Sequence, residues 1–273
     1  MEKTKVLFVS QEITPYLPEN EMSYVGRFLP QGIQETGKEI RTFMPRYGLI
    51  NERRNQLHEV IRLSGMNLII DDSDHPLIIK VASIQSARMQ VYFIDNEDYF
   101  QRKAMFTDEN NEIFADNDER TIFFSRGVIE TVEKLRWSPD IIHCHGWISS
   151  LIPLYIKKSL KDNPLFCDSK VIYSVYNDDF EGKFHKSFKE KLKIEGIENE
   201  DITFLKKGDY VNLSKTAIDN SDAIIYGSEK VNPKLKKYID KLSKPVLPYH
   251  SKETFLKAYS EFYDKILETK QDD

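Results

Sequence analysis

An almost uninterrupted apolar run from Lys5 to Ser10 is the feature that most limits the possible folds of this chain. Such a run is typical of a strand buried on both faces of a parallel sheet. A helical pattern follows from about Glu21 to Thr36, and a second strand is expected over Ile40 to Met44. Pro30 lies inside the helical span and predicts a kink or a break. A strand, a helix and a parallel strand form a right-handed crossover in nearly all proteins, so the sequence predicts an α/β fold on a mainly parallel sheet.

The remaining patterns extend this sheet into a single Rossmann-like, doubly wound domain. A β-rich excursion between Leu57 and Asp95 is expected to form hairpins and to rejoin the sheet at Val91–Ile94. A long amphipathic helix is expected over Ser251 to Thr269, with Ser251 as its N-cap. The predicted organisation is one domain over residues 1–250 and a C-terminal helix over residues 251–273 that packs back on it. Further strands are expected at 141–144, 170–176 and 223–227, and further helices at 119–135, 184–192 and 208–219. Residues 244–247 fit either a last short strand or an extended link, and Ser228 is expected to cap the segment after residue 227.

Composition excludes several classes of protein. Charged residues make up 30% of the 273 residues, and the net charge of −5 gives no reason to expect nucleic acid as a partner. Two cysteines, Cys144 and Cys167, lack metal-ligand spacing and are expected to be buried thiols in a reducing compartment. The first residues lack the apolar core of a signal peptide, and no apolar run is long enough to cross a bilayer. These observations predict a cytoplasmic protein without a metal site or a membrane contact.

Residues 139–158 concentrate unusual side chains at one point of the predicted sheet. The short strand expected at 141–144 contains His143 and is followed by His145 and a turn at Gly146. Trp147 then precedes a helix that Ser149 or Ser150 is expected to cap. The carboxyl edge of an open parallel sheet is where ligands bind, so these residues form a candidate site. His143 is interpreted as a satisfied interior histidine. For His145 and Trp147, a ligand surface and ordinary packing both stay open.

Acidic and amide residues cluster before the helix expected at residues 119–135. The run Asp116-Asn117-Asp118-Glu119 fits capping, because carboxylates and asparagine satisfy the free amides at a helix N-terminus. Capping accounts for some of these residues and not necessarily for all of them.

With these segments in place, the sequence resembles the glycogen and starch synthases, which are retaining glucosyltransferases of the two-domain GT-B type. The resemblance extends from about Lys5 to Tyr226 and depends on the order and spacing of five segments. They are Val6 to Pro15, Met44 to Asn51, Tyr92 to Arg102, Asp116 to Ser125 and Pro139 to Pro153.

The resemblance implies that this chain corresponds to the N-terminal, acceptor-side domain of such enzymes. In the family a second domain holds most of the sugar nucleotide, and glucose passes from ADP-glucose or UDP-glucose to the 4-hydroxyl of an α-glucan end. No metal or other cofactor is required. The acceptor-side residues that the resemblance carries over are Tyr47, Asp116, Asn117, His145, Trp147, Tyr176 and Asn177.

The first loop departs from the family's Lys-Thr-Gly-Gly-Leu-Gly-Asp, whose glycines and lysine approach the donor's phosphates. Here the aligned residues begin Pro18-Glu19-Asn20-Glu21, so the lysine and the glycines are absent and two carboxylates are present. A glutamate beside a diphosphate in a closed cleft repels it by ~1 kcal/mol or more. This degenerate donor loop predicts that sugar nucleotide does not bind in the family's manner.

Two further departures concern catalysis. Ile148 stands where the family has a polar residue beside the reacting sugar, and the residues after Tyr226 are too few for a second Rossmann domain. The helix from Ser251 fits either the helix that ends GT-B chains or a new helix over exposed apolar surface. The chain is therefore expected to be inactive on its own.

Three functions are carried forward as hypotheses. The first is a non-catalytic, synthase-derived domain that binds α-glucan, such as a maltooligosaccharide, or a partner protein. The second is an active α-1,4-glucosyltransferase completed by a separate chain. The third is a structural or regulatory interaction module. Tyr47, Trp147 and Tyr176 are candidate aromatic platforms for sugar, although each also fits a core position.

Overall fold

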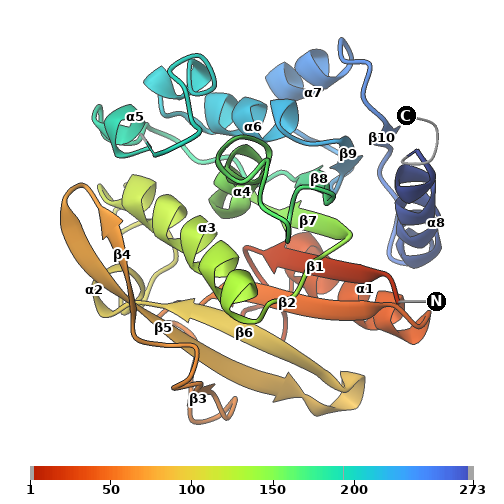
Figure 1. Cartoon of the computed structure of the whole chain (residues 1–273), viewed down its shortest axis with the longest axis horizontal. Coiled ribbons are helices and arrows are strands. Elements are labelled where there is room, and N and C mark those ends of the chain that lie inside the picture. The colour runs from red at the N-terminus through yellow and green to blue at the C-terminus, as the bar shows by residue number, and fades with distance from the viewer. Residues whose placement is uncertain (1–2, 193, 270–273) are drawn as a thin grey trace.

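The computed structural model describes residues 3–192 and 194–269 (Figure 1). Its strands are β1 (Lys5–Ser10), β2 (Glu39–Pro45), β3 (His58–Glu59), β4 (Met66–Ile70), β5 (Ser73–Ile84), β6 (Met89–Asp95), β7 (Ile141–His145), β8 (Lys170–Val175), β9 (Ala223–Tyr226) and β10 (Val246–Leu247). They form one open sheet in the order β10-β9-β8-β7-β1-β2-β6-β5-β3, with β4 paired to β5. Neighbours from β10 to β6 are parallel, and β5 is antiparallel to β3, β4 and β6. The predicted α/β fold with a mainly parallel sheet is confirmed.

The centre of the sheet lies at β1, between β2 on one side and β7 on the other. Val6 pairs with Ile40 of β2 and with Ile141 of β7. The last five residues of β1 are buried, as the apolar run predicted. Because the chain leaves β1 toward β2 and later returns on the opposite side at β7, the strand order reverses at this point. The carboxyl ends of β1 and β7 therefore form the topological switch point of the fold.

Helices cover both faces of the sheet (Figure 1). They are α1 (Glu21–Glu35), α2 (Glu97–Phe100), α3 (Asn117–Lys134), α4 (Leu151–Leu154), α5 (Phe188–Lys191), α6 (Tyr210–Asp219), α7 (Pro233–Ile239) and α8 (Phe255–Glu268). One face packs against α1 and α8, where Leu29, Tyr259 and Tyr263 join Phe8 and its neighbours in a single buried cluster. The opposite face packs against α3, α4 and α6 in a larger cluster. This arrangement is the doubly wound one that the sequence predicted.

The β-rich excursion is also confirmed. β4 and β5 form a hairpin, β6 returns antiparallel to β5, and β6 then joins the parallel sheet beside β2. Asp71 and Asp72 form the turn of this hairpin with positive φ angles of 50° and 59°, and Ser73 already belongs to β5. Short polar side chains tolerate this left-handed conformation, which explains why aspartates stand there.

Several expected helix boundaries are wrong. Helix α8 begins at Phe255 instead of Ser251, because residues 252–254 form a turn and the Ser251 hydroxyl donates to Glu253 at 2.5 Å. Helix α5 covers only 188–191 of the expected 184–192. Ser228 does not cap α7, since Asn232 does so by accepting from the backbone amide of Lys234.

Helix α1 runs through Pro30 as one helix, so the break that was one of the two predicted outcomes does not occur. Proline removes one hydrogen bond from a helix interior, at a cost of about 3 kcal/mol. Leu29 and Ile33 on either side are fully buried against the sheet, and this packing holds the helix together across the lost bond.

The segment after β7 is less regular than expected. Trp147–Ser149 forms a 3₁₀ turn, α4 follows, and Tyr155–Ser159 forms a π-helical turn. Neither predicted serine caps the helix, because the Ser149 hydroxyl donates to the Gly146 carbonyl at 2.7 Å and Ser150 makes no capping bond.

The two cysteines were both expected to be buried. Cys144 is buried, as expected, whereas Cys167 is exposed, so that expectation is wrong for Cys167.

Candidate functional site

The switch point brings the ends of β1 and β7 into direct contact. The Gln11 amide donates to the His145 carbonyl at 3.0 Å, and the Gln11 side-chain oxygen accepts from the Ile148 amide at 3.3 Å. Gly146 lies between them with a φ of 83°, and a Cβ there would come within 2.7 Å of the Gln11 Cβ. A side chain at residue 146 would therefore meet both a strained backbone conformation and a steric clash, so glycine is required there.

A crevice opens beside this junction, at the carboxyl edge of the sheet. It consists of two adjoining hollows of about 290 and 250 Å³ that share Asn20 and Glu21, and we call them together the switch-point crevice. The first hollow is lined by Glu12, Asn20, Glu21, Met22, Tyr176, Asn177, Asp178 and Ser228. The second is lined by Glu19, Asn20, Glu21, Tyr24, Val25, Gly227, Tyr249, His250, Lys252 and Phe255.

The N-terminus of α1 points into this crevice but is closed by its own side chains. The Ser23 amide donates to the Asn20 side chain, and the Asn20 amide donates to the Ser23 hydroxyl, both at 2.8 Å. The result is a capping box, which satisfies the backbone amides of Asn20 and Ser23. Glu21 lies in the first helical turn and accepts from the Ser228 hydroxyl at 2.5 Å.

Carboxylates dominate the degenerate donor loop, Pro18 to Glu21. Glu12 accepts from the Asn20 side chain at 2.5 Å, so it lies against the same helix end. Glu19 pairs with Lys252 at 2.8 Å, and the Lys252 ammonium lies 3.9 Å from the centre of the Tyr24 ring. The lysine is thus already engaged by a carboxylate and an aromatic face. Carboxylates therefore outnumber cations among the residues that line the crevice.

Asp178 is a site residue that the sequence analysis missed. Its carboxylate accepts from the Trp147 amide at 3.0 Å and from the Tyr210 hydroxyl at 2.8 Å. Burial raises the pKa of Asp178 to about 6. It therefore fixes the turn after β7 to the end of β8. An aspartate directly after a strand, at the predicted ligand edge, was the signal available in the sequence.

Trp147 lies inside an aromatic cluster and not on a surface. Its ring centre is 4.4 Å from that of Phe106, 4.9 Å from Phe180 and 5.8 Å from Phe184, and the side chain is 2% exposed. Tyr47 contacts the same Phe106 edge-on at 5.5 Å and is fully buried. Neither ring presents a face to solvent on which a sugar would stack.

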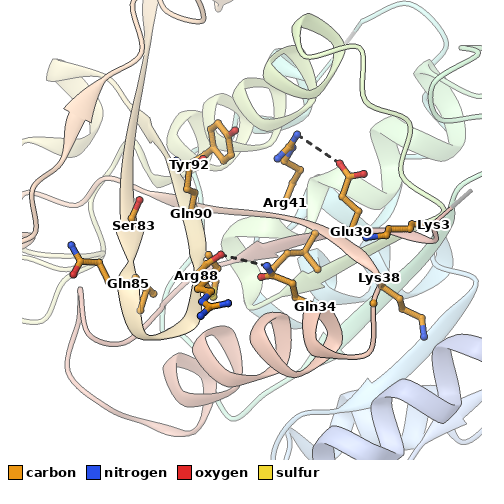
Figure 2. Close-up of a pocket in the computed structure, with 14 residues that line it drawn as sticks. Lys3, Gln34, Lys38, Glu39, Arg41, Ser83, Gln85, Arg88, Gln90 and Tyr92 are labelled. Carbon is orange, nitrogen blue, oxygen red and sulfur yellow. Dashed lines mark hydrogen bonds and ion pairs between the residues drawn. The ribbon is translucent and has the colours of Figure 1, made fainter.

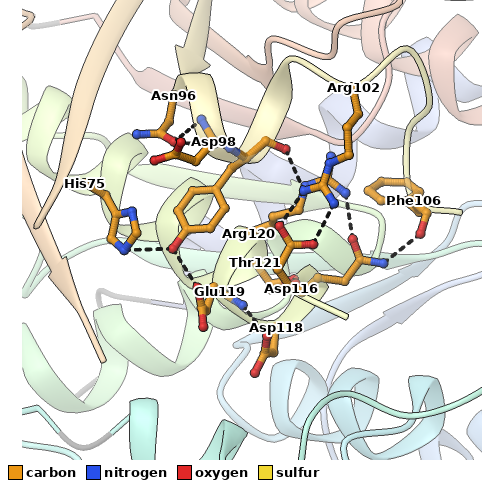
Figure 3. A network of polar contacts seen from close by, with 12 residues as sticks. His75, Asn96, Asp98, Arg102, Phe106, Asp116, Asp118, Glu119, Arg120 and Thr121 are labelled. Carbon is orange, nitrogen blue, oxygen red and sulfur yellow. Dashed lines mark hydrogen bonds and ion pairs between the residues drawn. The ribbon is translucent and has the colours of Figure 1, made fainter. Parts of the chain in front are cut away.

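Asp116 and Asn117 belong to a polar network at the start of α3 (Figure 3). Asp116 forms a two-bonded ion pair with Arg102, one bond of which is 2.9 Å, and it makes no side-chain bond to the helix amides. The Asn117 side chain donates to the Phe106 carbonyl at 2.8 Å and accepts from Arg120 at 2.6 Å. The two residues thus hold the segment over Trp147 in place, and capping explains neither.

Arg120 is the most buried cation of this network. Its side chain is 1% exposed and lies over the rings of Phe100 and Phe114, at 5.1 and 5.5 Å. Burial lowers the pKa of Arg120 to about 10. A neighbouring set joins Tyr99 to Glu119 at 2.8 Å, and Lys191 binds both Glu119 and Asp118.

His145 and Tyr176 lie together on the side of the sheet that α8 covers. The Tyr176 hydroxyl and His145 Nδ1 are 2.9 Å apart, and the neighbouring His143 contacts the hydroxyls of Tyr263 and Ser174 at 2.5 and 2.7 Å. The interpretation of His143 as a satisfied interior residue agrees with these contacts. Burial lowers the pKa of His143 well below its usual value and that of His145 to about 3.

The predicted site residues are therefore divided among three places. Tyr47, Asn117 and Trp147 meet around Phe106, and Asp116 binds Arg102 beside them. His145 and Tyr176 form a buried pair. Asn177 lies in the switch-point crevice with an exposed side chain, next to Glu21 of the donor loop.

Within residues 3–192 and 194–269, no group of three or more His, Cys, Asp or Glu side chains has an arrangement that would hold a metal ion. No helix of the described part of the chain is long and apolar enough to cross a bilayer.

Comparison with known proteins gives a consistent result. The sequence profile of the family described as "Starch synthase catalytic domain" matches residues 5–239. The chain is 37% identical over 221 residues to the glycogen synthase of Chlorobium limicola, covering 81% of this chain and 45% of that protein. It is 34% identical over 240 residues to the glycogen synthase of Pelodictyon phaeoclathratiforme, covering 86% and 48%.

Among solved structures, the catalytic domain of starch synthase IV from Arabidopsis thaliana, bound to ADP and acarbose, has a TM-score of 0.69 and 18% sequence identity. The match covers 97% of this chain and 50% of that one, and at this identity it shows the shared fold. The chain spans about half the length of the curated relatives that it matches.

Proposed function

Because the chain belongs to the starch synthase catalytic domain family, we propose that it is an acceptor-side unit that binds α-glucan in the switch-point crevice without binding sugar nucleotide. On its own it transfers no glucose, and it acts in the cytoplasm. The observation that carries this proposal is the chemistry of the crevice, where carboxylate and amide side chains gather around a helix end whose own capping box uses two of its amides.

Such a lining suits a neutral ligand rich in hydroxyl groups. Carboxylate oxygens accept hydrogen bonds from hydroxyls, and asparagine both donates and accepts. Glu12, Glu21 and Asp178 supply carboxylates, Asn177 supplies an exposed amide, and Tyr249 adds an aromatic side chain to the second hollow. This assignment moves the glucan contact away from Trp147 and Tyr47, which the core encloses.

We expect maltoheptaose to bind saturably, and the Asn177→Ala variant to bind it about three- to tenfold more weakly, because one or two hydrogen bonds to sugar hydroxyls are lost. Isothermal titration calorimetry measures both affinities. The Asn177 side chain is exposed, so the substitution should leave the thermal unfolding midpoint unchanged.

Asn199→Ala is the matched control, since Asn199 is an exposed asparagine outside the crevice. Its affinity for maltoheptaose should equal that of the wild type. If the wild type and Asn177→Ala bind maltoheptaose with equal affinity, the crevice is not the glucan site.

We expect no binding of ADP-glucose at about 5 mM, a concentration that would reveal a millimolar dissociation constant. Glu12, Glu19 and Glu21 surround the helix end that the family resemblance assigns to phosphates, and each repels a diphosphate by ~1 kcal/mol or more in a closed cleft. Differential scanning fluorimetry with ADP-glucose, and with maltoheptaose as the positive comparison, is the measurement. A dose-dependent rise of the unfolding midpoint with ADP-glucose would contradict this part of the proposal.

A further inference from the structure

The segment between β10 and α8 forms one wall of the second hollow of the switch-point crevice. We call residues 248–254 the strap. Three of them, Tyr249, His250 and Lys252, line the hollow, and they face residues of the degenerate donor loop and of α1 across it. The strap therefore belongs to the crevice, although its residues lie more than 200 positions after the donor loop in the sequence.

Both ends of the strap are anchored in the fold. At one end, β10 pairs with the parallel strand β9. At the other end, α8 buries Phe255 and Tyr259 on the sheet. A further tie to α8 comes from Lys38, the residue before β2, whose ammonium pairs with Asp264 at 3.0 Å, and Figure 2 shows the Lys38 side chain extending toward this helix. The strap is thus fixed where it begins and where it ends.

The middle of the strap is held less firmly by its backbone. Within the described part of the chain, no backbone hydrogen bond joins residues 249–253 to another strand or to the donor loop. The bonds present are internal to the turn, where the amides of Thr254 and Phe255 both donate to the Ser251 carbonyl at 3.0 Å. A segment with so few backbone bonds opens at a low free-energy cost, so side chains determine where it lies.

Lys252 is the side chain that fastens the strap to the donor loop. Its ammonium pairs with Glu19 at 2.8 Å and lies 3.9 Å from the centre of the Tyr24 ring. A carboxylate and an aromatic face from the other wall of the hollow thus attract the same cation. The Lys252 and Glu19 side chains are 51% and 55% exposed, so the pair can open while the rest of the protein stays folded.

Tyr249 contacts the donor loop three residues before Lys252. Hydrogen bonding to the Glu21 carboxylate raises the pKa of Tyr249, and Glu21 also accepts from the Ser228 hydroxyl at 2.5 Å. Glu21 lines both hollows, so Tyr249 reaches the boundary between them only while the strap is closed. The two carboxylates of the degenerate donor loop are therefore the groups that contact the strap.

From these contacts, and on the basis of the glucan site proposed above, we propose that Lys252 is a positioning residue that keeps the strap closed over the second hollow. The closed strap places Tyr249 beside a glucan chain that extends from the first hollow. The two hollows measure about 290 and 250 Å³, so the second holds about as much of a glucan as the first. When the Lys252–Glu19 pair opens, only the first hollow contributes, and the preference for long glucans over short ones falls.

Calorimetric titration of the full chain with maltose and with maltoheptaose measures this preference. The wild type should bind maltoheptaose at least about tenfold more tightly than maltose, because the second hollow adds hydrogen bonds and an aromatic contact. Lys252→Glu should lower this ratio at least about threefold and leave the affinity for maltose unchanged, since like charges at residues 19 and 252 repel each other.

A charge swap separates positioning from direct contact with the sugar. The double variant Glu19→Lys/Lys252→Glu restores an attractive pair with its charges exchanged, and it should recover the wild-type ratio. The matched control is Lys257→Glu, which reverses an exposed cation of α8 that pairs with Glu261 outside the crevice, and it should keep the wild-type ratio. An unchanged ratio in Lys252→Glu, or a ratio that the swap fails to restore, would overturn the proposal.

A second measurement needs no glucan. Trypsin cleaves after Lys252 only when the strap is open, so Glu19→Gln should be cut there about two- to fivefold faster than the wild type, whereas Glu261→Gln, which removes the exposed partner of Lys257, should be cut at the wild-type rate. Equal rates in Glu19→Gln and the wild type would show that the ion pair does not hold the strap. Faster cleavage of Glu19→Gln without any binding of maltoheptaose would instead contradict the proposed glucan site and leave the role of the ion pair intact.

Discussion

Replacing Trp147 by alanine is expected to lower the free energy of unfolding by about 3–5 kcal/mol. The indole is 2% exposed and packs against Phe106, Phe180 and Phe184, so its removal leaves a cavity that three rings from different segments cannot fill. The backbone amide of residue 147 also donates to Asp178, which ties the cluster to the strand next to it.

Urea denaturation monitored by circular dichroism measures this loss of stability. Leu49→Ala is the matched control, because Leu49 is 48% exposed at the same edge of the sheet and should change the free energy of unfolding by less than about 0.5 kcal/mol. A Trp147→Ala variant as stable as the wild type would mean that the indole is not a core residue, and it would restore Trp147 as a candidate sugar platform.

The second large effect concerns acid stability. His143 and His145 are buried with pKa values far below the usual 6.5, and that of His145 is about 3. The unfolded chain therefore binds more protons than the folded chain between about pH 6.5 and the native pKa values, so stability falls as the pH falls through this window. His145 should contribute a loss of roughly 2–3 kcal/mol between pH 6.5 and 4.5, and His143 should contribute in the same direction.

A comparison of variants isolates this contribution. Asp178, whose pKa is raised to about 6, acts in the opposite direction, because its folded form holds a proton that the unfolded form releases. The wild type and His145→Gln are therefore compared at each pH by urea denaturation, with His185→Gln, an exposed histidine, as control. The difference in stability between wild type and His145→Gln should shrink as the pH falls, whereas a constant difference would show that His145 titrates normally.

The sequence predicted the sheet well because its signals are local. The run from Lys5 to Ser10 is apolar on both faces, and the pattern of a strand, a helix and a strand admits one handedness. Errors arose where tertiary contacts decide the outcome. Helix α1 passes through Pro30 because Leu29 and Ile33 pack on the sheet, and α8 starts four residues late because Glu253 binds the Ser251 hydroxyl.

The candidate site was harder to predict than the fold. Sequence alone placed His145, Trp147 and Asn177 at one edge of the sheet, but it did not show which side chains the loop from Arg102 to Asp116 would cover. Asp178 was missed because its role depends on the Trp147 amide and the Tyr210 hydroxyl, which are distant in sequence.

The most direct test of the central claim is a calorimetric titration with maltoheptaose followed by ADP-glucose in the same cell. An acceptor-side unit with a closed, acidic helix end should give saturable heat with maltoheptaose and none with ADP-glucose, whether or not glucan is already bound. Saturable binding of both ligands would contradict the account and would indicate a functional donor site, and binding of neither would replace glucan by a protein partner as the occupant of the switch-point crevice.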